Sequence, residues 1–355
     1  MNYCELEQEL LEFSEAEKIY KELYLQNFVV YEEIVKDWSD FVVKYCKYFT
    51  SDIDIPLTAP SFIGRELLEK DWFPQNEIEI FSFKNARYCP AFLHSLEFIK
   101  LIYVLRGQCV LHVENKEIKM QRGGFCLVSP NIEQTIFSCN DEDIVINVIM
   151  RRSTFSTAFF SLLTEQGIIS DFFGQMLYSK NSNKIMLFSC ESDPVLDRTI
   201  LDLYNEASYQ DKPSNLLLKS FVMIFFAYVL RNHQNDVVPL GKISSKNNTL
   251  PKIIRYIKEN FEYVTLVTLA EHFHMSEGYI SRYIRRETGY TFSYLLRELR
   301  MRQAAGMLRN TPCSIEEIIE AVGYTDTSHF YHNFKNIYGM TPSMYRKRED
   351  VYIIE

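Results

Sequence analysis

Two stretches of the chain carry small, polar and basic side chains at helical spacing. In the first stretch, the residues at positions i, i+3, i+4 and i+7 are Gly278, Ser281, Arg282 and Arg285. Fifty residues later the same spacing brings together Ser328, Tyr331, His332 and Lys335. Residues at this spacing share one face of a helix. Guanidinium, ammonium and hydroxyl groups on such a face bind phosphates and the edges of DNA bases. The pattern therefore predicts DNA binding rather than catalysis.

A short helix and a tight turn precede the first face. Residues 265–273, TLVTLAEHF, have helical spacing, and Ala270 is small enough to let a second helix cross closely. Ser276 is a natural N-cap for that second helix, on which Ile280 and Ile284 mark the buried side. Two short helices joined by a tight turn are typical of the helix-turn-helix, whose second helix enters the DNA major groove.

The second copy has the same construction. SIEEIIEAV opens with Ser314 and Glu317, the S-x-x-E capping box, and Asp326 caps the helix after the turn. Phe330 and Phe334 mark the buried side of this helix. A long helix, YLLRELRMRQAAGML, connects the copies and would hold the recognition helices about one DNA turn, roughly 34 Å, apart. The alternative is a helical domain with a solvated basic face. Two copies in register, each followed by G-x-T-x-S, make that alternative the weaker one.

Charge is distributed unevenly in this chain of net charge −9. Residues 250–348 hold 14 Lys and Arg against 10 Asp and Glu, whereas residues 1–249 hold 24 against 34. A phosphate backbone senses local charge, so the excess supports DNA binding by the repeat. Eight cysteines without a C-x-x-C pair argue for reduced thiols in a cytoplasm and against a disulfide framework or a zinc site.

The amino-terminal half alternates between helical and strand patterns. Residues 1–59 contain no Gly or Pro before Pro56 and are predicted to be helical. Residues 60–150 hold short β-branched and aromatic runs separated by turn formers, which predict a small antiparallel sandwich or barrel. The predicted strands are EIEIFSF, KLIYVLRG, CVLHVEN, GFCLVSP, TIFSC and DIVINVIM.

Helical spacing returns over residues 151–242, which are predicted to form a dimerisation or linker segment. Asp193 before Pro194 marks one helix start. The following helix contains the ten-residue apolar run 221–230, which is too short to span a bilayer and predicts a buried helix. A polar linker is expected at 235–249. The predicted fold is multidomain α+β: a small antiparallel β-barrel with flanking helices, then an all-α domain with two helix-turn-helix units over residues 243–348.

Residues 250–348 closely resemble the DNA-binding domain of the AraC/XylS family of bacterial transcription regulators. The resemblance lies in the two repeated units and in the closing G-x-T-P-x-x-Y-R, complete at residues 339–346. It implies base-reading positions at Gly278, Ser281, Arg282, Thr327, Ser328, Tyr331 and His332. The full predicted DNA-binding set adds Arg285, Arg286 and Lys335, with Arg286 directed toward the phosphate backbone.

Residues 92–137 resemble the cupin-type sensor barrel often found in this family. Cupin enzymes bind a metal through H-x-H-x-x-x-E and a later His. Here those positions hold His94, Leu96, Lys100 and Gln134, so one ligand of four remains and no metal is predicted. His94 and Lys100 become candidate anchors for a small effector. A buried Lys100 is expected to reach solvent, meet a carboxylate such as Glu97, or bind an anionic or hydroxyl-rich ligand. A filled barrel used for dimerisation is the alternative.

Together these features predict a cytoplasmic, non-enzymatic transcription regulator that is a homodimer without a cofactor and does not bind membranes. Its predicted partners are double-stranded DNA, a small effector such as a sugar or other metabolite, and RNA polymerase if it is an activator. Two alternatives remain open. The amino-terminal half could bind a protein partner, for which the acidic residues 1–59 are the support, or a cupin-type enzyme could be fused to the DNA-binding domain.

Overall fold

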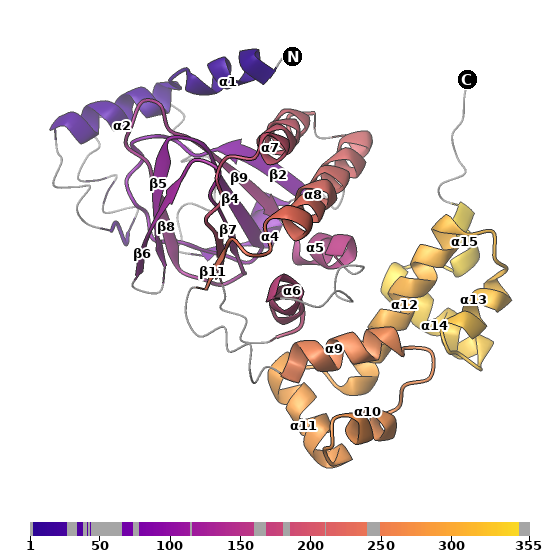
Figure 1. The fold of residues 1–355 in the computed structure, drawn as a ribbon. Helices are drawn as coiled ribbons and strands as arrows, with labels where there is room; N and C mark the ends of the chain where they lie inside the picture. Colours follow the sequence, from indigo (N-terminus) through magenta and orange to yellow (C-terminus); the bar gives the residue numbers. More distant parts are fainter. Residues whose placement is uncertain are drawn as a thin grey trace, which may run out of the picture. The chain divides into compact units, whose positions relative to one another are not determined.

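The computed structural model describes residues 3–26, 34–37, 41, 43, 66–73, 78–113, 116–159, 168–179, 185–209, 211–239 and 249–347. The chain forms two compact units. Unit 1 comprises residues 1–160 and 182–243, and unit 2 comprises residues 161–181 and 244–355. Figure 1 shows the sheets and their helices in unit 1 and a set of helices in unit 2. Most of the predicted helices of residues 1–59 beyond residue 26 lie outside the described residues.

Unit 1 contains all the described strands. They are β1 (Glu66–Leu67), β2 (Ile80–Lys84), β3 (Ser95–Leu96), β4 (Ile99–Arg106), β5 (Gln108–Val113), β6 (Lys116–Gln121), β7 (Phe125–Val128), β8 (Gln134–Phe137), β9 (Ile144–Met150), β10 (Ile185–Phe188) and β11 (Val237–Pro239). Its helices are α1 (Tyr3–Leu11), α2 (Glu15–Gln26), α4 (Glu69–Trp72), α5 (Arg152–Phe159), α7 (Pro194–Glu206) and α8 (Lys212–Asn232).

Two antiparallel sheets enclose the core of unit 1. One has the strand order β11-β10-β7-β4-β9-β2 and the other the order β6-β5-β8, while β1 and β3 form a short parallel pair. Side chains alternate between the faces of a strand. Ile102 and Val104 on β4 therefore meet Leu111 on β5 and Ile136 on β8 between the sheets. This arrangement is a two-layer sandwich.

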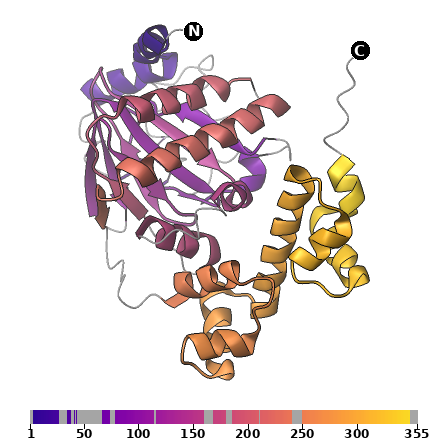
Figure 2. The same ribbon diagram turned by 45° about the vertical axis from the view of Figure 1, so that its right-hand side comes forward.

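Helices cover the opposite face of the large sheet. Figure 2 shows α7 and α8 lying across it. Phe225 of α8 packs edge-on against Tyr103 and Phe125, with ring centroids 6.0 and 5.2 Å apart, and the Tyr103 hydroxyl donates to Asp197 of α7 at 2.6 Å. A strand covered on both faces is apolar at nearly every position, which explains the continuous run of β4.

Antiparallel strands followed by a helical region are confirmed, but the closed cupin-like barrel is not. Among the described strands, the ladders end at β11 and β2 in one sheet and at β6 and β8 in the other. Alternating runs specify an inner face and antiparallel neighbours, and a sandwich satisfies both as well as a barrel does. Five of the described strands were also not predicted: the short pair β1 and β3, and β6, β10 and β11, the last of which lies inside the predicted linker.

Helix α8 is only half-buried, contrary to the prediction of a buried helix. Val222, Phe225, Phe226 and Val229 are buried, whereas Leu216, Leu217, Met223 and Ile224 are exposed. By length and composition alone the stretch from Pro213 to Asn232 could cross a membrane. Its aromatic side chains instead pack on the large sheet and on α5, where Phe226 contacts Phe155. In α7 the apolar side chains of Leu196, Ile200 and Leu203 are fully buried, so this helix packs within the chain.

A buried ion cluster joins α2 to the large sheet. Glu17 forms a reciprocal capping box with Ser14 and accepts hydrogen bonds at 3.0 Å from Arg87 and 2.9 Å from Lys84. The side chains of Glu17 and Arg87 are both fully buried. Burial alone would raise the pKa of Glu17, but hydrogen bonds from Arg87 and Lys84 outweigh it and lower the pKa to about 2. This S-x-x-E capping box at residues 14–17 was not predicted from the sequence.

We predict that Glu17→Gln lowers the free energy of unfolding by about 3–5 kcal/mol, because it leaves the guanidinium of Arg87 buried without its counter-charge. A denaturant titration measures this, with Glu15→Gln as the control; its exposed pair with Lys18 should contribute less than about 1 kcal/mol. The Glu17 contribution is present above pH 4.5 and is lost as pH falls toward 2, since the folded pKa is the lower one. Equal losses in the two variants would contradict this assignment.

Candidate nucleic-acid interface and ligand cavity

The first helix-turn-helix consists of α10 (Leu266–His272) and α11 (Glu277–Thr288). Thr265 caps α10 in a box with Thr268, and the Ser276 hydroxyl accepts from the backbone N–H of Tyr279 at the start of α11. Ile280 and Ile284 are fully buried, as predicted. The turn between the helices places His274 in the left-handed region, with φ 54°.

The second helix-turn-helix consists of α13 (Ile315–Ala321) and α14 (Thr327–Tyr338). The predicted capping box of Ser314 and Glu317 is confirmed, and so is the Asp326 cap, which accepts from the backbone N–H groups of residues 328 and 329. Phe330 and Phe334 are fully buried. The internal repeat of the sequence is therefore a repeat of structure.

The recurring G-x-T-x-S ends each recognition helix and starts the next one. Gly289 and Gly339 end α11 and α14 in the left-handed conformation, with φ of 79° and 72°, which glycine adopts readily. Thr291 then caps α12 (Phe292–Asn310), and the Thr341 hydroxyl accepts from Met344 in α15 (Pro342–Lys347). The motif fixes where each recognition helix stops.

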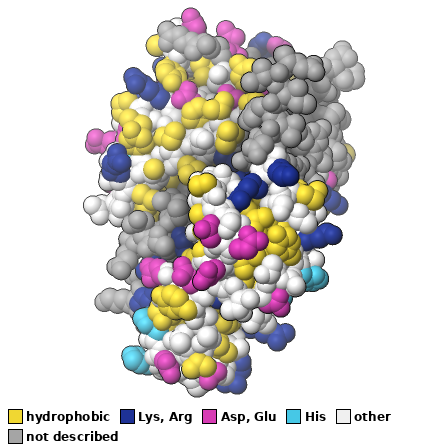
Figure 3. Space-filling view, turned by 90° about the vertical axis from the view of Figure 1, so that its right-hand side faces the viewer, with side chains coloured by type: hydrophobic (Ala, Val, Ile, Leu, Met, Phe, Trp, Pro, Cys, Tyr) yellow, Lys and Arg dark blue, Asp and Glu magenta, His cyan; other side chains and the backbone are white. Residues whose placement is uncertain are grey.

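The ten predicted DNA-binding residues lie on the outward sides of α11 and α14. Ser281 and Tyr331 are half-buried, and the other eight residues are exposed. Two of these side chains have polar side-chain partners: Arg286 pairs with Glu287 at 2.8 Å, and the His332 Nε2 lies 2.9 Å from the amide nitrogen of Asn336. Figure 3 shows one face of the molecule, on which basic and acidic side chains are interspersed.

Arg300 of α12 joins the two helix-turn-helix units. Its guanidinium donates to the backbone carbonyls of Phe261 and Glu262, each at 2.8 Å, in the turn after α9 (Thr249–Glu259). The same group lies 5.5 Å from the ring centroid of Tyr324, in the turn of the second unit. The backbone comes so close here that a Cβ atom on Gly323 would lie 2.0 Å from the Glu262 carbonyl oxygen.

Helix α6 (Ile168–Tyr178) extends unit 2 beyond the predicted DNA-binding region. It lies against α9, and its Asp171 accepts from Arg255 at 2.7 Å. Phe172, Phe173 and Met176 are fully buried. The residues before position 243 thus contribute to the core of this unit, which the sequence pattern did not indicate.

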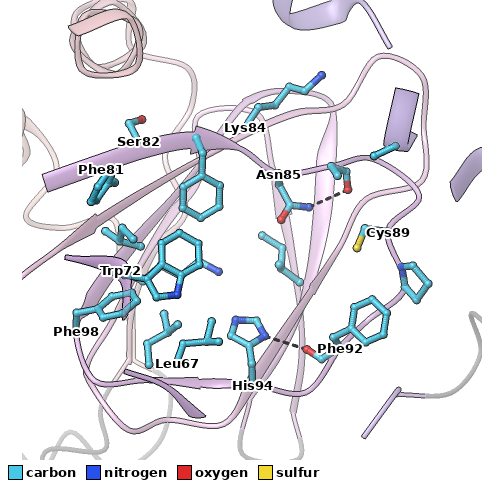
Figure 4. Close-up of a pocket in the computed structure, with 18 of the residues that line it drawn as sticks. Leu67, Trp72, Phe81, Ser82, Lys84, Asn85, Cys89, Phe92, His94 and Phe98 are labelled. Carbon is cyan, nitrogen blue, oxygen red and sulfur yellow. Dashed lines mark hydrogen bonds between the residues drawn. The ribbon is translucent and has the colours of Figure 1, made fainter. Parts of the chain in front are cut away.

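Unit 1 contains a cavity of about 450 Å³ between the sheets and the amino-terminal helices. Its wall is mostly apolar and includes Leu67, Trp72, Phe81, Phe83, Phe92, Leu96, Phe98, Ile136 and Ile149. Figure 4 shows these aromatic rings around the space, with His94 and Phe92 on one side and Lys84 extending away from it. The size is that of sites for small organic molecules.

The two predicted effector-binding residues, His94 and Lys100, both line this cavity. Burial, together with the charge of Lys100, lowers the pKa of His94 to about 3, so its imidazole is neutral. The Nδ1 atom lies 2.9 Å from the carbonyl oxygen of Phe92, which can only accept. The proton is therefore on Nδ1, and the lone pair of Nε2 remains available as an acceptor.

Lys100 lies on the inner face of β4, in line with Ile102 and Val104. It is 4% exposed, and burial lowers the pKa of its ammonium to about 8, so it is mostly charged at neutral pH. Among the described residues, no carboxylate or carbonyl pairs with it. Glu97, a partner considered from the sequence, instead accepts from the backbone of Glu69 at 2.8 Å.

Comparison with known proteins matches residues 269–348 to a family described as a helix-turn-helix domain. Residues 269–348 are an AraC-type helix-turn-helix domain. The chain is also similar to the HTH-type transcriptional regulator GadX of Escherichia coli O6:H1, with 23% identity over 70% of this chain and 85% of the relative.

Two solved structures are similar as well. The carboxy-terminal domain of AraT, a response regulator from Geobacillus stearothermophilus, is 35% identical over 29% of this chain and 88% of that one, with a TM-score of 0.27. Unsaturated fatty acid-bound ToxT from Vibrio cholerae is 17% identical over 76% of this chain and 94% of that one, with a TM-score of 0.30.

We predict that Arg300→Met destabilises the AraC-type domain by about 1.5–3 kcal/mol, because charge-assisted hydrogen bonds to two carbonyls are lost. DNA affinity should fall more for a duplex with two adjacent major-groove sites than for one with a single site, since the spacing of α11 and α14 is loosened. Fluorescence anisotropy on the two duplexes measures this, with Lys252→Met, an exposed change on α9, as the control. Equal losses on both duplexes would show that Arg300 does not set the spacing.

Proposed function

We propose that this protein is a sequence-specific DNA-binding transcriptional regulator whose amino-terminal cavity binds a small effector. The observation that carries the proposal is the pair of equivalent outward faces on α11 and α14, both held by one helix, α12. At a rise of about 1.5 Å per residue, the 19 residues of α12 span roughly 28 Å, close to one turn of DNA. The two faces would read successive major grooves from one side of the duplex.

Within these faces we assign two roles. Arg282 is exposed one turn into α11, where side chains reach base edges, and it can donate to both acceptors of a guanine. Arg286 lies one turn further on, beside Tyr283 and paired with Glu287, and would contact phosphate. An exposed ion pair contributes little, so Glu287 is no obstacle to that contact.

We expect Arg282→Ala to cost about 1–3 kcal/mol on the specific site and to relax base preference at one position. Arg286→Ala should weaken binding to specific and random duplexes alike. It should also reduce the slope of log affinity against log salt concentration by about one released ion. Binding isotherms of the full chain at several salt concentrations, on both kinds of duplex, distinguish the two variants. Identical behaviour of the two variants would refute the proposed orientation of α11.

For the effector we propose an apolar molecule that carries one carboxylate. A charged ammonium that is buried without a counter-charge is unfavourable, and an anion in the cavity would supply that charge. Neutral His94 offers one acceptor, but the remaining wall is apolar. A sugar needs many hydrogen-bond partners, so this cavity favours a hydrophobic acid over the sugar considered from the sequence.

Lys100→Met should raise the free energy of unfolding by about 2–4 kcal/mol at neutral pH, because the folded pKa is depressed and the ammonium opposes folding below pH 8. This gain should vanish above pH 10.5. The variant should also lose the ability to distinguish a hydrophobic acid from its methyl ester. Thermal-shift titrations with a series of matched acids and esters test this, with Lys119→Met, an exposed lysine of unit 1 outside the cavity lining, as the control. Unchanged discrimination would remove Lys100 from the site.

Three further proposals concern assembly, location and partners. Homodimerisation is supported by the exposed apolar side chains of α8, which include Leu216, Met223 and Ile224. A regulator that acts on bacterial DNA would work in the cytoplasm, and an activator would contact RNA polymerase. The alternative of a protein partner for unit 1 loses part of its support, because α1 and α2 pack on unit 1 through Glu17 and Arg87.

A further inference from the structure

Four chain segments bring polar side chains together at one edge of the large sheet, apart from the cavity. Cys190 follows β10, and Asp236 immediately precedes β11. The pairing of Phe188 with Val237 in these strands sets the two residues side by side. His233 is the C-cap of α8, and Asp193 is the N-cap of α7. The fold thus collects a thiol, an imidazole and two carboxylates.

The imidazole of His233 lies between the two carboxylates. Its Nδ1 is 2.7 Å from Asp236 Oδ2, and its Nε2 is 3.1 Å from Asp193 Oδ2. One ligand atom from each of Cys190, His233 and Asp236 lies within 4.8 Å of the other two. Cys190 is 8% exposed and the His233 side chain 12%, so the group is enclosed but reachable.

We propose that Cys190, His233 and Asp236 bind one Zn²⁺ ion, with His233 ligating through Nδ1. Thiolate sulfur, imidazole nitrogen and carboxylate oxygen are the three kinds of ligand that zinc takes in proteins. Three protein ligands leave a fourth, tetrahedral position for water. A soft thiolate beside an imidazole also favours zinc over magnesium or calcium, which prefer oxygen alone.

Asp193 is the positioning residue of this site. A histidine that binds a metal usually donates its other ring N–H to a carboxylate, which fixes both the tautomer and the orientation of the ring. Asp193 accepts from Nε2 in this way, while its other oxygen accepts from the backbone N–H of Val195 and holds the carboxylate in place. That arrangement directs Nδ1 toward Asp236 and Cys190.

The proton balance follows from the hydrogen bonds. Without metal, burial and the neighbouring carboxylates keep Cys190 as a thiol, with its pKa raised to about 12. One proton lies between His233 Nδ1 and Asp236. Zinc displaces both protons, which leave to solvent, and it forms bonds to sulfur, nitrogen and oxygen in their place. The ion would join the ends of β10 and α8 to the starts of α7 and β11, and so stabilise unit 1.

The test uses the full chain, stripped of metal with a chelator and then titrated with Co²⁺ and with Zn²⁺. Cobalt should bind with one equivalent per chain and give the near-ultraviolet absorption of a thiolate–cobalt bond, and zinc should displace it. Zinc should also raise the thermal unfolding midpoint. Cys190→Ser should abolish the absorption and weaken zinc binding by about 100-fold or more. Cys313→Ser, in unit 2, is the matched control and should change neither.

Two further variants separate ligand from positioning roles. Asp236→Asn should weaken zinc binding while keeping the thiolate absorption at saturating cobalt. Asp193→Asn should weaken it by about 10–100-fold, also with the absorption retained. Unfolding midpoints of the metal-free variants, close to that of the unaltered chain, establish that each is folded. Absence of a stoichiometric cobalt signal in the unaltered chain, or its persistence in Cys190→Ser, would overturn the proposal and leave a hydrogen-bonded cluster.

Discussion

The relative placement of the two recognition helices depends on one half-buried contact, the guanidinium of Arg300 against the turn after α9. Helix α12 by itself sets only the distance between the helix-turn-helix units. The two carbonyls that Arg300 binds, and the close approach of Gly323 to Glu262, fix how the units are turned about that helix. A planar group with several donors suits this task better than lysine would, because it binds two carbonyls and contacts the Tyr324 ring simultaneously.

In unit 1 the corresponding constraint is the covering of both faces of the large sheet. The helices α7 and α8 cover one face and the smaller sheet covers the other, so the side chains of β4 are buried on both faces from Ile99 to Leu105. On the inner face this geometry leaves the side chain of Lys100 only 4% exposed, in the wall of the cavity. Lys100 therefore lowers the stability of unit 1 unless an anion binds beside it. A buried charge of this kind is a candidate for ligand recognition.

The two proposed small-ligand sites of unit 1 differ in character. The cavity is apolar with a single charged group, whereas the cluster at Cys190 is polar and small enough for an ion. The cluster connects the last strand of unit 1 to its two long helices, and the chain continues from β11 into unit 2. Occupancy of either site would thus act on the stability of unit 1 rather than on the outward faces of α11 and α14.

The sequence by itself determined the AraC-type domain, because local signals act over a few residues. Caps at Ser276, Ser314 and Asp326, glycines that end helices, and paired apolar positions fix each helix wherever the rest of the chain lies. The sequence also predicted that His94 and Lys100 belong to one site, and both line the same cavity, although in a sandwich rather than a barrel. Only the tertiary structure decided four other features: the sandwich, the burial of Glu17 with Arg87, the packing of α6 on α9, and the proximity of Cys190 to His233. Each depends on a pairing between distant segments, such as β10 with β11, which no local pattern specifies.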